Sequence, residues 1–318
     1  MKSRLSSLAW VALAAAALPG IASADRFEGA REAIRRHMQE KQVPGLAVAV
    51  WQDGKILWQQ GFGWADVENR VAATEHTMFC LASVSKSLTA IGLMTLVEAG
   101  KVDLDKPAND YLGPDQIKSW IGDADAATVR RLANHTAGFT GSSQFFYGEE
   151  LKQLPPISQN IARYGFLGTP AGERFAYSNI GYGVLGQLIE RVSGKSYGDY
   201  MRQNVFLPLG MTHSSLNLAP GLEKHQAVRY DFDRVPLPFY ESAEPASASL
   251  YSSAHDLARF GLFFSKHRQK DQAAILSEKS IARMTDQLVS QNATTVKGAP
   301  RSYGVGWMVS QEGGYELV

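Results

Sequence analysis

The segment CLASVSKSLTA, residues 80–90, places a serine and a lysine three positions apart, at Ser83 and Lys86. The apolar residues that follow predict a helix from Ser83 to Ala99, ended by Gly100. On a helix these two side chains share a face, so the lysine amine can reach the serine hydroxyl. The helix N-terminus also stabilises negative charge at the serine. A chain of this length contains about one S-x-x-K by chance. Alone, the pair has two equally good interpretations. One is a nucleophile with its base, and the other is a polar helix start with a solvated lysine.

A second group, Tyr177-Ser178-Asn179, lies at the start of a helix predicted over 179–192. A tyrosine can pass a proton to a leaving group when nearby cations lower its pKa. An asparagine can hydrogen-bond a lysine and a substrate amide at once. A loop tyrosine and an N-cap asparagine are each common alone, but S-x-x-K and Y-x-N at two helix starts rarely coincide by chance. The sequence therefore predicts a catalytic site of Ser83, Lys86 and Tyr177, with Asn179 as the residue that positions Lys86 and the substrate.

Five segments together resemble those of one superfamily, at residues 80–90, 132–138, 175–182, 250–260 and 303–307. The superfamily is that of the serine β-lactamases and penicillin-binding proteins. The resemblance is to class C β-lactamases, D-Ala-D-Ala carboxypeptidases, D-aminopeptidases and family VIII esterases, and it extends from about residue 30 to the end. It implies an α/β fold in an α+β arrangement, with an antiparallel sheet lobe flanked by helices, an all-helical lobe, and the active site between them.

The same resemblance implies a role for each site residue. Ser83 attacks a carbonyl, Lys86 takes its proton, and Tyr177 passes a proton to the leaving group and then activates water. The Ser83 backbone N–H is one oxyanion donor, whereas the second comes from a strand that carries K-T-G or H-x-G after the Tyr-Gly-x-Gly-Trp segment. The sequence ends at Val318 before such a motif, so we expect the second donor, the last strands and the terminal helix to be missing. His135, in a turn bounded by glycine, is expected to be structural.

The two ends of the chain show the clearest local patterns. A basic start, a short apolar run and Ala22-Ser23-Ala24 indicate a secretory signal peptide over residues 1–24, too short to span a bilayer. A helix is predicted over 25–42, then two antiparallel strands over 45–51 and 56–62 joined by Asp53-Gly54. One further strand is predicted over 303–309, followed by a Gly313-Gly314 turn and a partner strand. We therefore expect one domain over 25–318, with a sheet lobe formed by 25–80 and 300–318 and a mainly helical lobe over 81–299.

Composition and motif searches narrow the function further. Without residues 1–24, Lys and Arg number 30 against 31 Asp and Glu, a net charge of −1 that gives no reason to expect nucleic acid or an anionic membrane as a partner. The chain has no G-x-S-x-G, H-E-x-x-H, Walker loop or G-x-G-x-x-G, and its seven histidines show no metal-ligand spacing. We expect no metal and no cofactor.

These observations favour an exported serine hydrolase, periplasmic or extracellular and without a stable membrane anchor after signal cleavage. It would act through an acyl-enzyme on an amide, β-lactam or ester bond in a small-molecule or peptide substrate. Two alternatives stay open: a non-catalytic sensor that binds penicillin or peptidoglycan, and an inactive truncated fragment. The sequence alone does not choose among the three substrate classes, and it does not indicate the oligomeric state.

Overall fold

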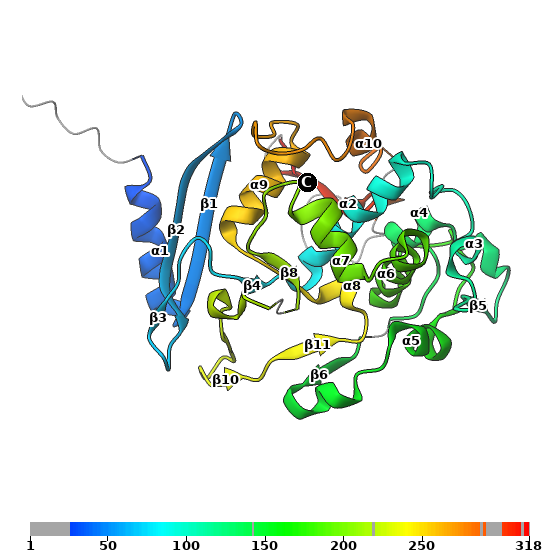
Figure 1. The fold of residues 1–318 in the computed structure, drawn as a ribbon, viewed down its shortest axis with the longest axis horizontal. Coiled ribbons are helices and arrows are strands. Elements are labelled where there is room, and N and C mark those ends of the chain that lie inside the picture. Colours follow the sequence, from blue (N-terminus) through cyan, green and yellow to red (C-terminus); the bar gives the residue numbers. More distant parts are fainter. Residues whose placement is uncertain are drawn as a thin grey trace, which may run out of the picture. The chain divides into compact units, whose positions relative to one another are not determined.

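The computed structural model describes residues 26–141, 143–217, 220–286, 289–290, 301–312 and 315–317 (Figure 1). The predicted signal peptide and the Gly313-Gly314 turn lie outside these residues. The helices are α1 (Glu28–Lys41), α2 (Ser85–Glu98), α3 (Asn109–Leu112), α4 (Val129–Ala133), α5 (Ile157–Tyr164), α6 (Asn179–Ser193), α7 (Tyr197–Met201), α8 (Pro245–Ala248), α9 (Ala254–Phe264) and α10 (Glu278–Ala282). Within the described ranges, we find no helix with the length and apolar character needed to cross a membrane.

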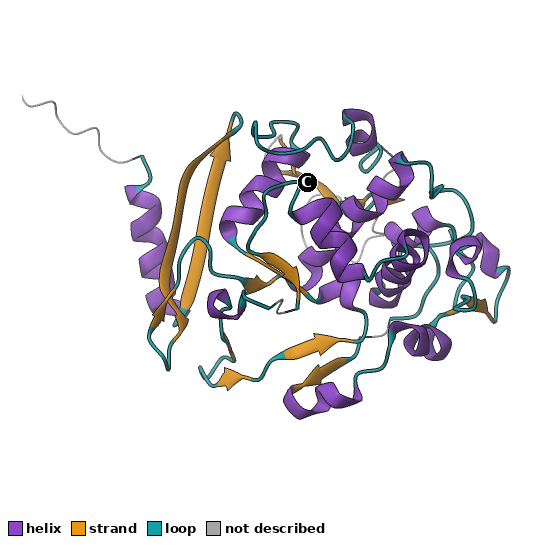
Figure 2. Ribbon diagram, viewed as in Figure 1, coloured by secondary structure: helices purple, strands orange, loops and turns teal. Residues whose placement is uncertain are grey.

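The strands are short apart from the first two, and they form several small sheets (Figure 2). They are β1 (Gly45–Gln52), β2 (Lys55–Asp66), β3 (Val71–Ala72), β4 (Phe79–Cys80), β5 (Lys118–Ser119), β6 (Phe145–Tyr147), β7 (Phe166–Leu167), β8 (Ser214–Leu216), β9 (Arg229–Tyr230), β10 (Pro236–Leu237), β11 (Tyr240–Ser242), β12 (Leu250–Ser252), β13 (Val289–Ser290), β14 (Arg301–Tyr303), β15 (Met308–Glu312) and β16 (Tyr315–Leu317). All the pairs of named strands are antiparallel except β5 with β7. The predicted mixture of antiparallel sheets and many helices is confirmed.

The chain divides into two compact units, residues 1–43 and residues 44–318. In the first unit α1 begins and ends within the predicted range, and Gln42 ends it in the left-handed conformation with φ of 52°. The second unit opens with the predicted hairpin of β1 and β2. Asp53 and Gly54, both with positive φ, form the tight turn between the strands because that backbone shape matches strand twist. Helix α9 packs against β1.

Helix α2 occupies the centre of the second unit. It is apolar on most sides, and ten of its fourteen residues are buried, as expected for a helix enclosed by other elements. Helices α6 and α8 pack against it. Because α2 begins just after Ser83 and α6 begins at Asn179, the two central helices present their N-terminal ends to one place.

The three-stranded sheet β4–β12–β8 joins distant parts of the chain beside this centre. Tyr251 pairs with Cys80 on one side and with Ser215 on the other. The backbone N–H of Leu81 donates to the carbonyl of Leu250 at 2.9 Å, which ties the segment before Ser83 to β12. The sheet thus fixes where the nucleophile segment enters α2.

In the described residues, β1–β2–β3 and β13–β14–β15–β16 are hydrogen-bonded only within themselves. One expectation about these strands is wrong. The strand predicted over 303–309 is two strands, β14 and β15, separated by a turn. Gly306 has φ of +83° in this turn and its carbonyl accepts a hydrogen bond from the Ser87 hydroxyl at 2.8 Å, so the backbone bends towards α2. The lobe boundaries stay a prediction.

Candidate active site

Ser83 lies on a short 3₁₀ turn, Ala82–Val84, that leads directly into α2. The predicted helix therefore begins with a tighter turn than expected. Ala82, the residue before the serine, has φ of +44°, a left-handed conformation that is unfavourable for a residue with a Cβ atom. Such backbone strain is concentrated at functional sites. The arrangement leaves Ser83 exposed while Lys86, one turn later, is only 1% exposed.

The Lys86 amine has three polar neighbours. Its Nζ lies 3.2 Å from Ser83 Oγ, 2.8 Å from Asn179 Oδ1 and 3.0 Å from the Ser247 carbonyl oxygen. The last two atoms can only accept hydrogen bonds. A neutral amine that donates to both therefore directs its lone pair to the Ser83 hydroxyl. Burial lowers the pKa of Lys86 to about 7, opposed by the charge of Glu244, so the neutral form is accessible near neutral pH.

The Tyr177 hydroxyl donates to Ser83 Oγ at 2.8 Å, so the phenol and the amine both lie within hydrogen-bond distance of the nucleophile. Burial raises the pKa of Tyr177, and the hydrogen bond with Ser83 offsets only part of this. Lys86 Nζ lies 4.7 Å from the ring centre, yet the pKa of Tyr177 is raised. The phenol is therefore a proton donor near neutral pH, and the amine is the group suited to accept the serine proton.

Asn179 is the first residue of α6 and uses both ends of its amide. Its Oδ1 accepts from Lys86, and its Nδ2 donates to Ser143 Oγ at 2.8 Å. The N-cap of α6 is Ser178, whose hydroxyl accepts from the Gly181 N–H at 3.0 Å. Ser143 could not be predicted from the sequence, because it precedes β6 in a segment without a motif.

His135 lies behind the tyrosine and is 2% exposed. Its Nδ1 accepts a hydrogen bond from the Ser178 N–H at 3.1 Å, and its ring centre lies 4.4 Å from that of Tyr177. Burial, with a smaller effect of Lys86, lowers its pKa to about 3, so the ring is neutral and holds the Tyr177 backbone in place. The structure thus brings together the four residues predicted from sequence and adds His135, Ser143 and Ser247 around them.

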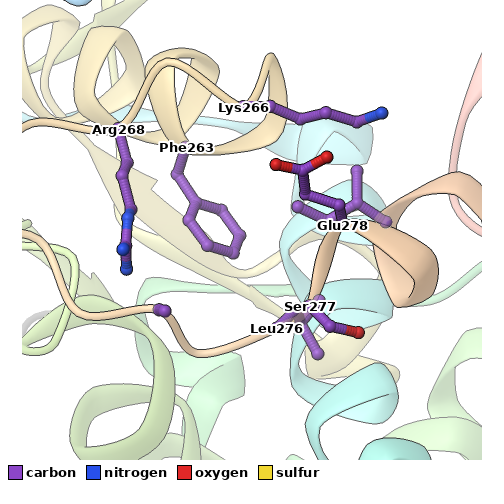
Figure 3. Close-up of a pocket in the computed structure, with 8 residues that line it drawn as sticks. Phe263, Lys266, Arg268, Leu276, Ser277 and Glu278 are labelled. Atoms are coloured by element: carbon purple, nitrogen blue, oxygen red, sulfur yellow. The ribbon is translucent and has the colours of Figure 1, made fainter.

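A separate cavity of about 220 Å³ lies between the end of α9 and the start of α10 (Figure 3). Phe263, Leu276 and Ile281 are among its apolar lining residues, with Lys266 and Arg268 at its edge. None of the four predicted site residues lines it. Across the described part of the chain, no group of three or more His, Cys, Asp or Glu side chains is arranged to hold a metal ion.

The β-lactamase family model matches residues 30–317. The chain belongs to the β-lactamase family. Membership supports a serine hydrolase-like function in general terms, and it gives the grouping of Ser83, Lys86 and Tyr177 a chemical context.

This β-lactamase-family protein is similar to proteins from all three domains of life. It is 25% identical over 285 residues to protein flp of Staphylococcus aureus strain N315, covering 88% of this chain and 55% of that protein. It is 27% identical over 310 residues to the human mitochondrial serine beta-lactamase-like protein LACTB, covering 74% of this chain and 56% of that protein. The chain thus spans about half the length of these relatives. The octameric penicillin-binding protein homologue from Pyrococcus abyssi has a similar structure, with a TM-score of 0.74 and 28% identity over 90% of this chain and 66% of that one.

Proposed function

We propose that this protein is a serine hydrolase that forms an acyl-enzyme at Ser83 on the carbonyl carbon of an amide, β-lactam or ester. The observation that carries the proposal is the set of contacts around Lys86. Two acceptors occupy the donors of the neutral amine, and its remaining position faces Ser83 Oγ at 3.2 Å. A serine nucleophile needs such an adjacent base because its hydroxyl is weak at its ordinary pKa.

In the acylation step, Ser83 Oγ bonds to the substrate carbonyl carbon while its proton moves to Lys86 Nζ. The carbonyl oxygen becomes an oxyanion, for which the Ser83 N–H is one expected donor, worth about 3–4 kcal/mol in sites of this kind. The second donor stays an expectation. When the intermediate collapses, the carbon–nitrogen or carbon–oxygen bond breaks and the leaving group takes the Tyr177 hydroxyl proton. Lys86 then gives the proton it took from Ser83 to the Tyr177 phenolate, which restores the neutral amine and the phenol.

In the deacylation step, water attacks the ester carbon formed with Ser83. Its proton passes to the Tyr177 and Lys86 pair, and the pair returns a proton to Ser83 Oγ as the ester bond breaks. Asn179 keeps the amine in place through both steps, because its amide is anchored at the other end on Ser143.

The test is covalent labelling of the purified protein with a fluorophosphonate probe and with a fluorescent penicillin, read as fluorescence on a denaturing gel. We expect Ser83 to be the labelled residue, identified by peptide mass spectrometry. The Ser83→Ala variant should lose the label and keep its fold by circular dichroism. Equal labelling of Ser83→Ala and the parent protein would exclude this mechanism.

The rate at which the penicillin label is lost separates the hydrolase from a binding protein. Loss of label with release of free product indicates turnover. A stable, stoichiometric label would favour the sensor alternative, and the absence of label with a native fold would favour an inactive chain.

Export is part of the same proposal and rests on the pattern of residues 1–24 alone. Cleavage after Ala24 would leave Asp25 as the first residue. N-terminal sequencing of the protein made in a bacterial host would check this, and a full-length cytoplasmic product that begins at Met1 would argue against it.

A further inference from the structure

Glu244 is a buried carboxylate close to the proposed base, and none of the steps above uses it. It is 0% exposed. Its Oε1 accepts from Asn160 Nδ2 at 2.7 Å, its Oε2 accepts from the Ser242 hydroxyl at 3.3 Å, and the Gln144 backbone N–H also donates to it. All three donors are neutral. Burying a charge without a cationic partner is unfavourable, so the location of the nearest balancing charge matters.

Lys86 is the cationic side chain on which the charge of Glu244 acts. The three contacts of its amine, to Ser83, Asn179 and Ser247, are also with neutral groups. Among the residues that the structure describes, neither the Glu244 carboxylate nor the Lys86 amine makes an ion pair, yet the charge of Glu244 acts on Lys86. Glu244 is thus the acidic group whose charge acts on the amine, while burial raises the pKa of Glu244 itself.

One turn of chain connects the two groups. Glu244 is the N-cap of α8, and its carbonyl accepts from the Ser247 N–H at 2.8 Å. The carbonyl of Ser247, at the other end of this turn, accepts from Lys86. On its other side the Glu244 side chain packs against α6, where a Cβ at Gly183 would lie 3.0 Å from its Cγ. The carboxylate is thus held in a fixed place relative to the amine.

The other titratable groups around Lys86 are neutral near pH 7. Tyr177 and Tyr182 face it from the α6 side, with ring centres 4.7 and 5.6 Å from Nζ, and burial raises the pKa of both phenols. Tyr303, behind them, also has a raised pKa, and His135 has its pKa lowered to about 3. Glu244 is consequently the charged group to which the amine responds.

We propose that Glu244 is a positioning residue for the general base, whose carboxylate balances the protonated Lys86 side chain and so holds the proton there until Tyr177 and the leaving group require it. The inference rests on the proposed role of Lys86. It predicts a function for the carboxylate that is separate from packing, because packing requires only the shape of the side chain.

The experiment measures the rate of labelling by fluorescent penicillin, or the hydrolysis of p-nitrophenyl acetate, from pH 5 to pH 9. The rate should rise with pH as Lys86 loses its proton. In Glu244→Gln, which keeps the shape and the contact with Asn160, we expect the midpoint of this rise to move to lower pH by about one unit. At pH well below the midpoint the variant is then about tenfold faster relative to its own plateau. The plateau itself falls a few-fold, since a weaker base accepts the proton less readily.

Two controls separate charge from structure. Glu241→Gln makes the same change three residues before Glu244, at a half-buried carboxyl group that is not among the charges acting on Lys86. This variant should leave the midpoint in place. Glu244→Asp keeps the charge and should restore most of the parent midpoint even if its plateau is lower. If Glu244→Gln does not fold, Ser242→Ala removes one donor to the carboxylate and should move the midpoint in the same direction by less.

The outcomes are distinct from those of the proposed function. Absence of Ser83 labelling in the parent protein contradicts the serine hydrolase itself. A parent that labels at Ser83, together with an unshifted midpoint in folded Glu244→Gln, overturns the role of Glu244 alone. A shift in Glu244→Asp as large as that in Glu244→Gln would also overturn it, because the shift would then follow shape and not charge.

Discussion

The hydroxyl oxygen of Ser83 has two neighbours with different acid–base properties. The Lys86 amine has a pKa lowered to about 7, whereas the Tyr177 phenol has a raised pKa. Desolvation drives both shifts, because it disfavours the charged ammonium of lysine and the charged phenolate of tyrosine alike. Loss of hydration therefore produces a base and an acid, both within hydrogen-bond distance of the same oxygen.

Tyr177→Phe should distinguish substrates by their leaving groups. It removes the hydroxyl that lies 2.8 Å from Ser83 Oγ and keeps the ring against His135. Loss of a general acid reduces rates by about 10²–10⁴-fold, so we expect kcat/KM for a β-lactam or an anilide to fall by about 10²-fold or more. A p-nitrophenyl ester should lose far less, since p-nitrophenolate leaves without protonation. Steady-state kinetics with both substrates checks this, and equal losses would contradict the assignment of Tyr177 as the acid.

At the scale of residues, the sequence predicted those whose type and spacing form a recognisable motif. Ser83, Lys86, Tyr177 and Asn179 stand at fixed spacings near helix starts, and the structure brings them together. Their catalytic roles stay predictions. The left-handed φ of Ala82 could not be predicted, because alanine carries no preference for that conformation. Glu244 could not be recognised because it belongs to no spacing pattern and is close to Lys86 only through tertiary packing.

At the scale of elements, the turn between β14 and β15 contacts the first part of α2. Gly306 has φ of +83°, and a Cβ there would lie 2.3 Å from the Cβ of Ala90. Its carbonyl accepts from Ser87, the neighbour of Lys86. The turn can approach the helix this closely only because residue 306 has no side chain.

Gly306→Ala should therefore destabilise the protein by about 2–4 kcal/mol, through backbone strain and steric overlap together. Gly100→Ala is the matched control, since Gly100 has φ of +69° but nothing within 4 Å of an added Cβ. Strain alone should make it about 1 kcal/mol less stable. Urea unfolding followed by tryptophan fluorescence measures both, and similar losses for the two variants would show that the contact with α2 contributes little.

Elements were predictable where one local signal dominates. The Asp53-Gly54 turn and the Gly100 that follows α2 each have a direct physical cause in the sequence. The single strand expected over 303–309 is wrong. The alternation of apolar and polar residues predicted it, but the backbone turns at Gly306. The partners of the strands at the two chain ends could not be predicted, because strand pairing depends on contacts over long sequence distances.

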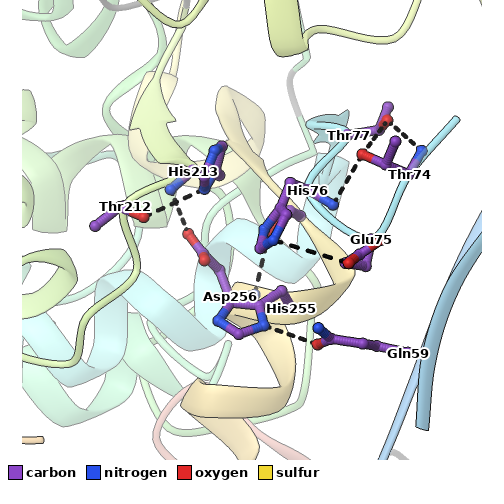
Figure 4. A network of polar contacts seen from close by, with 10 residues as sticks. Gln59, Thr74, Glu75, His76, Thr77, Thr212, His213, His255 and Asp256 are labelled. Atoms are coloured by element: carbon purple, nitrogen blue, oxygen red, sulfur yellow. Dashed lines mark hydrogen bonds and ion pairs between the residues drawn. The ribbon is translucent and has the colours of Figure 1, made fainter. Parts of the chain in front are cut away.

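At the scale of the whole second unit, four histidines from distant segments lie next to one another: His76, His213, His225 and His255. Figure 4 shows three of them, His76, His213 and His255. The ring centres of His76 and His213 lie 4.7 Å apart, those of His76 and His255 4.9 Å apart, and those of His213 and His225 4.6 Å apart. Asp256, which accepts from the His213 N–H at 2.7 Å, is also buried there. We call these four histidines the histidine cluster.

Acid should destabilise the folded protein through this cluster. Burial and the neighbouring imidazoles lower the pKa of His213 from 6.5 to about 4, and the pKa values of His225 and His255 are also lowered. An unfolded chain binds these protons below about pH 6.5 and the folded chain does not, so stability falls as the pH drops from about 6.5 towards 4. Asp256 acts in the opposite direction, because burial raises its pKa to about 6. The other charged groups acting on these side chains are Lys224, Arg259, Glu75 and Asp271. Three imidazoles lower the stability in acid and one carboxyl group raises it. We therefore expect a net loss of folding stability.

His213→Asn tests this expectation. It removes the imidazole that contacts two others, so the difference in Tm between pH 7.5 and pH 5 should narrow by about 2 °C or more. His267→Asn, at an exposed position in the same unit, should leave that difference unchanged. Differential scanning calorimetry at the two pH values gives the comparison, and an identical acid sensitivity of parent and His213→Asn would rule out the cluster as its source. No sequence pattern predicted this cluster, since residues 76 and 255 meet only in the folded chain.

The β4–β12–β8 sheet has a consequence for local opening, because it connects the histidine cluster to the nucleophile segment. The Met78 N–H donates to the His225 carbonyl, the Leu81 N–H to the Leu250 carbonyl, and the Leu250 N–H to Ser85 Oγ. Amide hydrogen exchange should therefore report these three amides as one cooperative group. Below pH 6 they should lose protection together, while the amides in the middle of α2 keep theirs. Loss of activity in acid would then precede loss of the fold.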